Sequence, residues 1–355
     1  MSAQIAGLGW VTPLGTGLDE VWKRLQSGDT AELKIIANPE TGRPLAYLPV
    51  PMKSVETVGR NPRMRRSSAI SYFAVAAGLA ALENAGPLVT PEVAARTAVI
   101  FAISDGGVLY TRKFYDQIVK QGANTASPLL FPETVYNAPA SHLAALLGID
   151  GASYTLVGDS SVGLAALHFG AQLLALGGID QCVVVGAEEC DWILCEAYAT
   201  WRMARTPLAE GAAAVVLRRE GKWALDTHPG VPFFRQREAA AALARVLAEM
   251  KTAESVDVIV SSANGLFGDR AEASALAARH ADARTFFPKR QLGEAPGASA
   301  LIQTVLAALA LEKLGLHRAL VPVVGFNQQA AAARVTSTRG ADPGLAESAS
   351  AKSGQ

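Results

Sequence analysis

The sequence contains little cysteine and no excess of charge of either sign. Its 355 residues include three cysteines, and 32 lysines and arginines balance 32 aspartates and glutamates. The cysteines, Cys182, Cys190 and Cys195, are odd in number and form no CxxC pair, which argues against a disulfide framework and a zinc site. Balanced charge argues against a nucleic-acid-binding or membrane-surface protein. We therefore expect small molecules or proteins as partners, and no metal or other cofactor.

Targeting segments are also lacking. From Met1 the chain passes directly into Ile5-Ala6-Gly7-Leu8-Gly9, a strand-and-turn pattern that leaves no room for a signal peptide. No apolar run has the length that a membrane span requires. These features, together with the low cysteine content, predict a cytoplasmic protein. Half of the residues are hydrophobic, which is enough for the core of one large domain or two closely packed domains.

Buried β-type runs alternate with helical segments along the chain, and this predicts a largely parallel or mixed sheet with helices on both faces. Residues 39–51 are expected to form a loop, and residues 338–355 a flexible tail. The expected strands are a short one after residue 4, then 97–103, 154–157, 181–185, 212–217, 257–260, 319–325 and 331–337. The expected helices are 19–25, 71–85, 110–120, 138–147, the segment after Ser161, 236–251, 271–279 and 298–314.

The stretch that begins at Tyr154 organises the rest of the chain. A β-type run, Tyr154–Val157, enters the turn Gly158-Asp159-Ser160-Ser161, and small and apolar residues on almost every side of the following helix predict that it is buried on nearly all faces. The first turn of a helix carries free N–H groups and the positive end of the dipole. Ser160 therefore occupies a favourable position for a nucleophile or an oxyanion.

Several segments resemble, in their order, the β-ketoacyl synthases of the thiolase superfamily, and the resemblance covers nearly the whole chain before the tail. The segments that carry the resemblance are Ile5–Gly15 with Trp22 and Leu25, Arg63–Arg66 with residues 74–86, Phe131–Asn137 with Leu147–Gly151, Gly186-Ala187-Glu188, and Glu210-Gly211-Ala212.

This resemblance implies a thiolase-like five-layered α/β/α/β/α duplicated fold. Residues 1–220 would form the N-terminal half and residues 221–337 the C-terminal half, with a buried helical layer shared between them. It also implies a dimer built across a central strand. In the family, a Cys-His-His set carries out decarboxylative Claisen condensation, and the histidines donate hydrogen bonds to the thioester oxygen and to the carboxylate that is lost.

That set is missing here. The family nucleophile falls on Ser160, the first histidine on Asn264 and the second on Glu294, while Asp269 and Glu272 match family residues downstream of the first histidine. A serine hydroxyl needs an adjacent base, unlike a thiol near neutral pH. An amide and an ionised carboxylate cannot replace two imidazoles, and the carboxylate would repel a malonyl group. We expect no condensing activity from these three positions.

A reduced C-terminal loop departs from the family as well. The Gly/Phe-rich loop that gates the acyl pocket in the family is shortened to Val324–Gln329. Phe326 in this loop, together with Gly106 and Gly107, is a candidate lining of an acyl pocket; alternatively, the two glycines allow close packing.

Other interpretations remain open at single residues. Ser160 is either a nucleophile or a helix cap, and Asp159 is expected to point away from it. The segment is no GxSxG elbow, because Val162 stands at the second glycine position. His168 is expected to be a buried, satisfied side chain or an interface residue. The group Arg63, Arg65 and Arg66 either meets an acidic acyl carrier protein or is a solvated helix start.

Condensing-enzyme relatives without the nucleophile are known as chain-length factors, and this chain resembles them. The resemblance implies pairing with an active ketosynthase in type II polyketide, aryl polyene or fatty-acid-like biosynthesis, where the inactive subunit shapes the acyl tunnel. Acyl carrier protein is a further candidate partner. The alternatives are a serine-dependent acyltransferase or thioester hydrolase that uses Ser160, and a homodimeric acyl-binding module.

Overall fold

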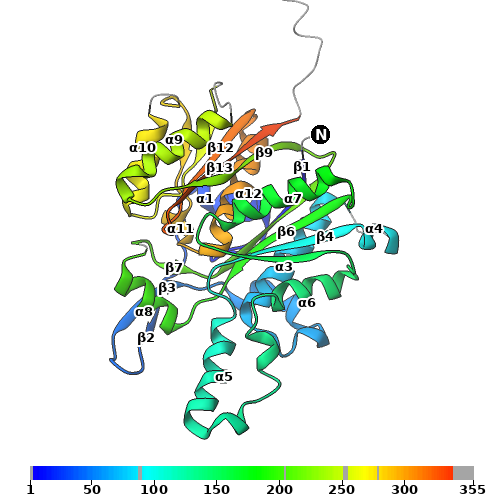
Figure 1. Cartoon of the computed structure of the whole chain (residues 1–355), viewed down its shortest axis with the longest axis vertical. Helices are drawn as coiled ribbons and strands as arrows, with labels where there is room; N and C mark the ends of the chain where they lie inside the picture. The colour runs from blue at the N-terminus through cyan, green and yellow to red at the C-terminus, as the bar shows by residue number, and fades with distance from the viewer. Residues whose placement is uncertain (1–2, 87–89, 204, 251–254, 278–279, 339–355) are drawn as a thin grey trace, which may run out of the picture.

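A mixed ten-stranded sheet runs through the molecule (Figure 1). The computed structural model describes residues 3–86, 90–203, 205–250, 255–277 and 280–338. Across the sheet the order is β11 (Arg284–Phe286), β10 (Val258–Val260), β12 (Arg318–Val324), β13 (Gln329–Ser337), β9 (Trp223–Pro232), β1 (Gln4–Val11), β8 (Gly211–Arg218), β6 (Gln181–Glu188), β4 (Thr97–Ile103) and β5 (Ser153–Val157).

The sheet consists of two five-stranded halves. Strands β1 and β9 join them through two residue pairs, Gln4 with Ala224 and Ile5 with Trp223. Within each half, the strands near the outer edge are parallel, as in β4 with β5 and β6, and antiparallel pairs lie towards the junction. The predicted division between residues 220 and 221 falls between β8 and β9.

Helices form three layers around these two half-sheets. In the middle, α7 (Val162–Leu176) and α12 (Pro296–Leu314) contact strands of both halves. The outer face of the first half carries α3 (Ala69–Ala85) and α6 (Ala138–Leu147), and that of the second carries α9 (Ala239–Glu249) and α10 (Phe267–Leu276). The structure therefore has the thiolase-like five-layered fold, which confirms the predicted fold class.

Helix α12 shows why the helices of the middle layer can be predicted from the sequence. Residues 296–311 are all buried, because sheets cover the helix on both sides and leave no polar face. Its length and composition would also suit a membrane span. The prediction that no apolar run is long enough to span a membrane is therefore wrong for this segment. In its most apolar stretch of 18 residues, 83% is buried inside the fold. No other helix among the described residues is long and apolar enough to span a membrane.

Smaller elements complete the structure. A second sheet has the order β2 (Lys34–Ala37), β3 (Pro44–Leu48), β7 (Leu208–Ala209). The remaining α-helices are α1 (Leu18–Gln26), α2 (Glu56–Gly59), α4 (Pro91–Ala95), α5 (Val108–Gln121), α8 (Trp192–Trp201) and α11 (Lys289–Leu292), and 3₁₀ turns cover Met52–Val55, Pro62–Met64, Ala123–Thr125, Phe131–Glu133 and Gln236–Glu238. Helix α5 projects from the body of the molecule at the bottom of Figure 1.

Some expected elements were wrong. The loop expected at 39–51 contains β3, and the sequence pattern also failed to predict β2, β9, β11 and α8. Helix α10 begins at Phe267, four residues before the expected start at 271. The C-terminal end of α7 is only partly buried, since Gln172 and Leu176 are exposed while Leu174 is buried. Of the predicted tail 338–355, Thr338 donates its N–H to the Lys222 carbonyl, and the residues beyond it lie outside the described part.

Candidate functional site

Ser160 lies where β5 passes into α7. The turn places it just before the N-cap residue Ser161, and its side chain is buried at 3% exposure. Asp159 accepts the N–H and the hydroxyl of Ser161 at 2.9 and 2.7 Å with one carboxylate oxygen, and the N–H of Asn327 at 2.7 Å with the other. Asp159 is thus turned away from the Ser160 oxygen, as expected, and it ties the helix start to the C-terminal loop.

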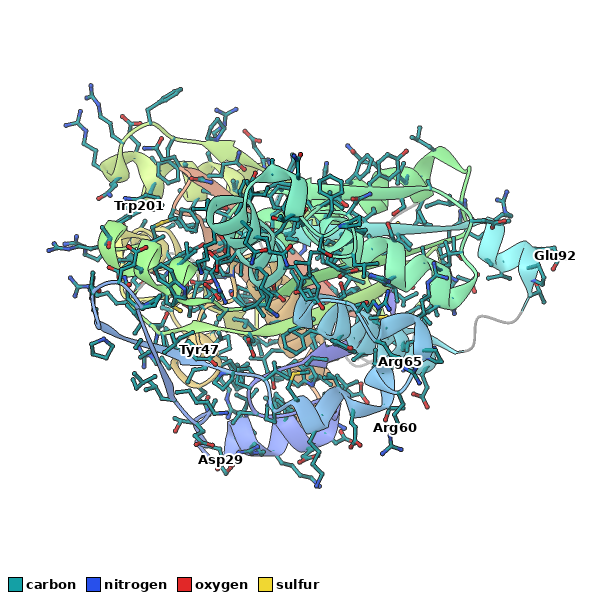
Figure 2. All side chains as sticks on the ribbon, turned by 90° about the horizontal axis from the view of Figure 1, so that it is seen from below. Asp29, Tyr47, Arg60, Arg65, Glu92 and Trp201 are labelled. Atoms are coloured by element: carbon teal, nitrogen blue, oxygen red, sulfur yellow. The ribbon has the colours of Figure 1, made fainter. Side chains whose placement is uncertain are left out.

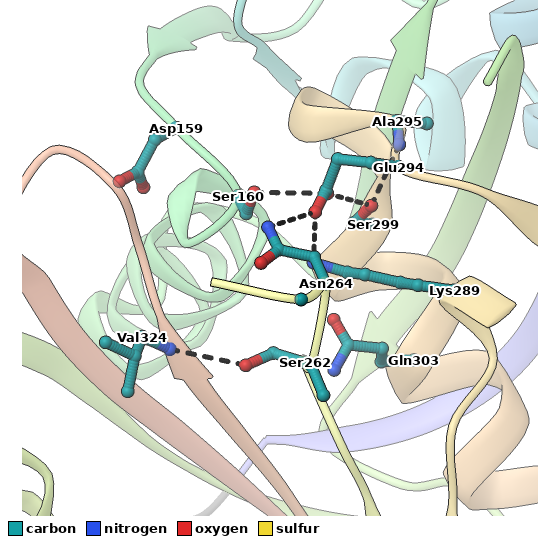
Figure 3. Close-up of polar contacts among 12 residues, drawn as sticks. Asp159, Ser160, Ser262, Asn264, Lys289, Glu294, Ala295, Ser299, Gln303 and Val324 are labelled. Atoms are coloured by element: carbon teal, nitrogen blue, oxygen red, sulfur yellow. Dashed lines mark hydrogen bonds and ion pairs between the residues drawn. The ribbon is translucent and has the colours of Figure 1, made fainter. Parts of the chain in front are cut away.

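Ser160, Asn264 and Glu294 meet at one point (Figure 3). The Ser160 hydroxyl donates to Glu294 Oε1 at 3.1 Å, and the Asn264 side-chain amide donates to Glu294 Oε2 at 2.9 Å. These residues follow β5 and β10 and precede α12, so three segments far apart in the sequence supply one cluster. The structure therefore brings together the three positions that the sequence resemblance assigned to one catalytic set.

The carboxylate of Glu294 accepts two further hydrogen bonds. Ser299 Oγ donates to Oε1 at 2.8 Å, and Lys289 Nζ donates to Oε2 at 2.7 Å. Glu294 is 1% exposed and Lys289 is 3% exposed, so the two form a buried ion pair. With four donors, the acceptor sites of the carboxylate are essentially filled. Lys289 therefore balances the negative charge of Glu294, and the sequence pattern gave no sign of the contacts of Glu294 with Lys289 and Ser299.

Backbone contacts hold this cluster in place. Glu294 donates its N–H to the Pro207 carbonyl, and its own carbonyl accepts the Ala209 N–H. Asp269 accepts the N–H groups of Asn264 and Gly265, both at 3.0 Å, which fixes the turn after β10. The side chains at the centre are therefore positioned by a rigid frame.

A second carboxylate supports the same turn. Glu272 accepts both the N–H and the hydroxyl of Ser262, at 3.0 and 2.7 Å. Burial raises the pKa of Glu272. Asp269 and Glu272, which the sequence resemblance matched to family residues, thus brace the loop that carries Asn264.

The hydrogen bonds of three histidines, His142, His168 and His228, go to groups other than Ser160. His168, half-buried, hydrogen-bonds the Thr227 hydroxyl at 3.1 Å, and burial lowers its pKa. His142 contacts Glu133 and Ser67, and His228 contacts Glu249. The three cysteines are buried and free, and burial raises the pKa of Cys182 to about 12.

The glycine pair and Phe326 have different roles. A Cβ at Gly106, where φ is +82°, would lie 2.7 Å from the Tyr136 ring, and one at Gly107 would lie 2.4 Å from the Glu133 carbonyl oxygen. This geometry favours close packing at both positions. Phe326 instead lies edge-on to Tyr198 at 5.8 Å between ring centroids and lines a cavity of about 640 Å³ beside Gly265.

Near Phe326 lies an acidic pair that the sequence analysis missed. Tyr198 donates its hydroxyl to Asp105 at 3.3 Å, and burial raises the pKa of Asp105 to about 6. Glu188 accepts the N–H groups of Ser104 and Gly297 with one oxygen. Burial and the neighbouring Asp105 raise the pKa of Glu188 well above its usual range. Only their position at the ends of β4 and β6 could have indicated that these carboxyls meet.

Comparison with models of known protein families places this chain in one of them. The model "Beta-ketoacyl synthase, N-terminal domain" matches residues 3–222, and "Beta-ketoacyl synthase, C-terminal domain" matches residues 222–327. The chain belongs to the β-ketoacyl synthase family. This confirms the resemblance drawn from the sequence.

Within the β-ketoacyl synthase family, the curated relatives are distant. The 3-oxoacyl-[acyl-carrier-protein] synthase 2 of Vibrio cholerae is 26% identical over 186 residues, 52% of this chain and 45% of the relative. The putative polyketide beta-ketoacyl synthase 2 of Streptomyces cyaneus is 26% identical over 195 residues, again 52% of this chain and 45% of the relative. The chain thus aligns with less than half the length of the curated relatives it matches.

Solved structures of family members share the fold over almost the whole chain. The ishigamide ketosynthase/chain length factor has a TM-score of 0.78 and 21% identity, and covers 95% of this chain and 99% of its own. The ketosynthase ApeO in complex with its chain length factor ApeC, from Xenorhabdus doucetiae, has a TM-score of 0.74, 16% identity and coverage of 95% and 98%. At these identities the similarity establishes the fold.

Proposed function

We propose that this chain is a non-condensing, chain-length-factor-like subunit of a cytoplasmic ketosynthase pair. Condensation requires groups that donate hydrogen bonds to the thioester oxygen and the departing carboxylate, as well as an activated nucleophile. In this chain the hydroxyl at the nucleophile position, Ser160, and the amide at the first histidine position, Asn264, are already bound to the chain's own Glu294. That occupied centre is the observation that carries the proposal.

An exposed apolar surface supports pairing with another subunit. Strand β5 is the edge of the ten-stranded sheet, and it presents Tyr154 and Val157 with 42% and 55% exposure. On the projecting segment that starts with α5, Tyr115, Val119 and Phe131 are more than half exposed. An unpaired strand edge and exposed apolar side chains are each typical of an interface.

A basic surface supports contact with an acidic carrier protein. Arg63, Arg65 and Arg66 are exposed, and they form no ion pair among the described residues. Figure 2 shows Arg65 and Arg60 near one another at the surface. In the proposed pair, this surface would be available to a carrier protein that delivers chains to the active subunit.

Reconstitution with an active ketosynthase tests the proposal. The chain would be co-expressed with the ketosynthase whose gene neighbours its own, and both the complex and the separate subunits would be assayed for elongation with malonyl-carrier protein. We expect a stable heterodimer in size-exclusion chromatography. Elongation should occur with the complex, with or without activity of the separate ketosynthase, and should not occur with this chain by itself. Elongation by this chain alone, or a stable self-dimer that ignores the ketosynthase, would contradict the proposal.

A second candidate is a serine-dependent acyltransferase or thioester hydrolase, and one contact favours it. Glu294 lies 3.1 Å from the Ser160 oxygen, within reach of a general base. Against it, the same carboxylate also binds Lys289, Asn264 and Ser299. Intact mass measurement after incubation with a labelled acyl-carrier protein distinguishes the two, since an adduct that disappears in Ser160→Ala requires the serine mechanism.

A further inference from the structure

Two adjoining cavities form a groove on the surface beside the candidate site. Their volumes are about 640 and 470 Å³, and both are lined by Gln236, Phe267 and Arg270. The larger cavity also contains Gly265 and Phe326, the neighbours of Asn264 and Asn327, so one end of the groove reaches the loops that carry the centre. Cavities of this size are in the range of small-molecule sites.

Four arginines line this groove, which we call the arginine groove. Arg202 and Arg205 line the larger cavity, Arg237 the smaller and Arg270 both. All four are exposed, and none forms an ion pair among the described residues. The lining carboxylate Asp269 is already bound by two backbone N–H groups. In a chain with no net charge, this is a local concentration of unpaired positive charge.

Aromatic rings stand beside these guanidinium groups. Trp201, 71% exposed, lines the larger cavity together with Phe326, and Phe267 lies where the two cavities meet. Guanidinium groups bind phosphate through paired hydrogen bonds and also stack on planar rings. An exposed tryptophan offers a surface for a planar base.

We propose that the arginine groove binds a nucleotide, of the kind carried by coenzyme A, with its phosphates on the arginines and its base against Trp201. The concave shape favours a small ligand over the acidic helix of a carrier protein, which needs a broader surface. The basic surface at Arg65 lies apart from Trp201 in Figure 2, so the two surfaces are separate. The proposal does not depend on pairing with a ketosynthase.

Calorimetric titration of the full-length chain tests this assignment. The probes are coenzyme A, adenosine 3′,5′-bisphosphate, pantetheine without phosphate, inorganic phosphate, and holo acyl carrier protein. We expect coenzyme A and the bisphosphate to bind, pantetheine not to bind, and inorganic phosphate to bind at least about tenfold more weakly, because it lacks the base.

Variants locate the site. Arg237→Ala and Arg270→Ala should each weaken the binding of the bisphosphate by about tenfold or more. Arg245→Ala, an exposed arginine on α9 that lines neither cavity, is the matched control and should not change it. As a second readout, the bisphosphate should quench tryptophan fluorescence in the wild-type chain and much less in Trp201→Phe.

Three outcomes would overturn the proposal. One is equal affinity for the bisphosphate in Arg237→Ala, Arg270→Ala and Arg245→Ala. Another is binding of inorganic phosphate as tight as that of the bisphosphate, which would indicate general anion binding. The third is binding of the carrier protein with no measurable binding of either nucleotide. None of these outcomes bears on whether the chain pairs with a ketosynthase, so the two proposals fail independently.

Discussion

At the scale of single residues, the centre is arranged around a buried charge that the chain supplies itself. Glu294 stands where the family resemblance places a histidine, and its carboxylate accepts hydrogen bonds from four side chains. A buried ion pair contributes little net stability compared with an apolar pair, but removal of one partner leaves an uncompensated charge. The residues at the centre are thus interdependent, and single substitutions should show it.

The first prediction concerns Lys289 and Glu294. Lys289→Met or Glu294→Gln should each lower the free energy of unfolding by about 3–5 kcal/mol, because each leaves one charge buried alone. The double variant should lose less than the sum, with a coupling of about 1–3 kcal/mol. Urea denaturation measures all three. Glu56→Gln, which breaks the exposed pair with Arg60, is the control and should change little. Simple additivity at the buried pair would contradict the structure.

The second prediction concerns Asp105. Burial raises the pKa of its carboxyl to about 6 in the folded chain. The folded chain therefore holds this proton more tightly than the unfolded chain does. The resulting stabilisation is complete below about pH 4 and is lost as the pH rises through about 6.

Asp105→Asn removes this titration and keeps an oxygen that can accept the Tyr198 hydroxyl. The variant should match the wild-type chain near pH 3 and exceed its free energy of unfolding at pH 8 by up to about 3 kcal/mol. Denaturation across this pH range measures the difference. Asp150→Asn, at an exposed position, is the control and should follow the wild-type profile. A difference that does not vary with pH would contradict the assignment.

At the scale of elements, β1 and α3 approach one another so closely that only glycine fits between them. A Cβ at Gly9 would lie 2.3 Å from the Ala77 carbonyl oxygen, and one at Gly7 would lie 2.2 Å from that of Ala81. These contacts involve the helix backbone, which cannot move aside as a flexible side chain can. The alternation of glycine in Ala6-Gly7-Leu8-Gly9 is therefore a packing requirement.

The third prediction follows from this contact. Gly9→Ala should lower the free energy of unfolding by about 3 kcal/mol, the upper range for overpacked positions. Gly178→Ala is a matched control, because a Cβ there meets nothing within 4 Å, and it should stay within about 0.5 kcal/mol of the wild-type chain. Thermal and urea denaturation measure both. Equal stability of the two variants would mean that β1 and α3 are not packed as described.

The elements also show what can be predicted from the sequence and why. Strands such as β4 and helices such as α12 are buried on both sides, and their continuous apolar runs made them predictable. Strand β9 contains Asp226, Pro229 and Gly230, which disfavour a strand, and it forms because β1 and β13 offer it partners. Local pattern carries no information about such tertiary pairing.

The candidate site, like the fold, could be predicted only in part from the sequence. The resemblance to the family indicated that Ser160, Asn264 and Glu294 share one centre, because it supplies a known three-dimensional arrangement. The contact of Glu294 with Ser299 could not be predicted, since Ser299 lies within the apolar sequence of α12. The meeting of Asp105 with Tyr198 likewise depends on the packing of α8, a helix that the pattern did not reveal.

At the scale of the whole molecule, the two ends of the sheet differ. Strand β11 at one end is three residues long, whereas β5 at the other end has five residues and carries exposed Tyr154 and Val157. An apolar strand edge left unpaired promotes association. If the chain pairs with a ketosynthase across β5, the continuous sheet would extend into the partner.

The fourth prediction tests this edge. Val157→Lys places a charge on the exposed side of β5 and should abolish co-elution with the ketosynthase, because an edge lysine opposes strand pairing and would have to lose its hydration in the interface. Ile35→Lys, on the edge strand β2 and 60% exposed, is the matched control and should leave the complex intact. Size-exclusion chromatography with light scattering measures the mass of each species. Since Val157 is 55% exposed, both variants should fold as separate chains, so a heterodimer that survives Val157→Lys would place the partner on a different face.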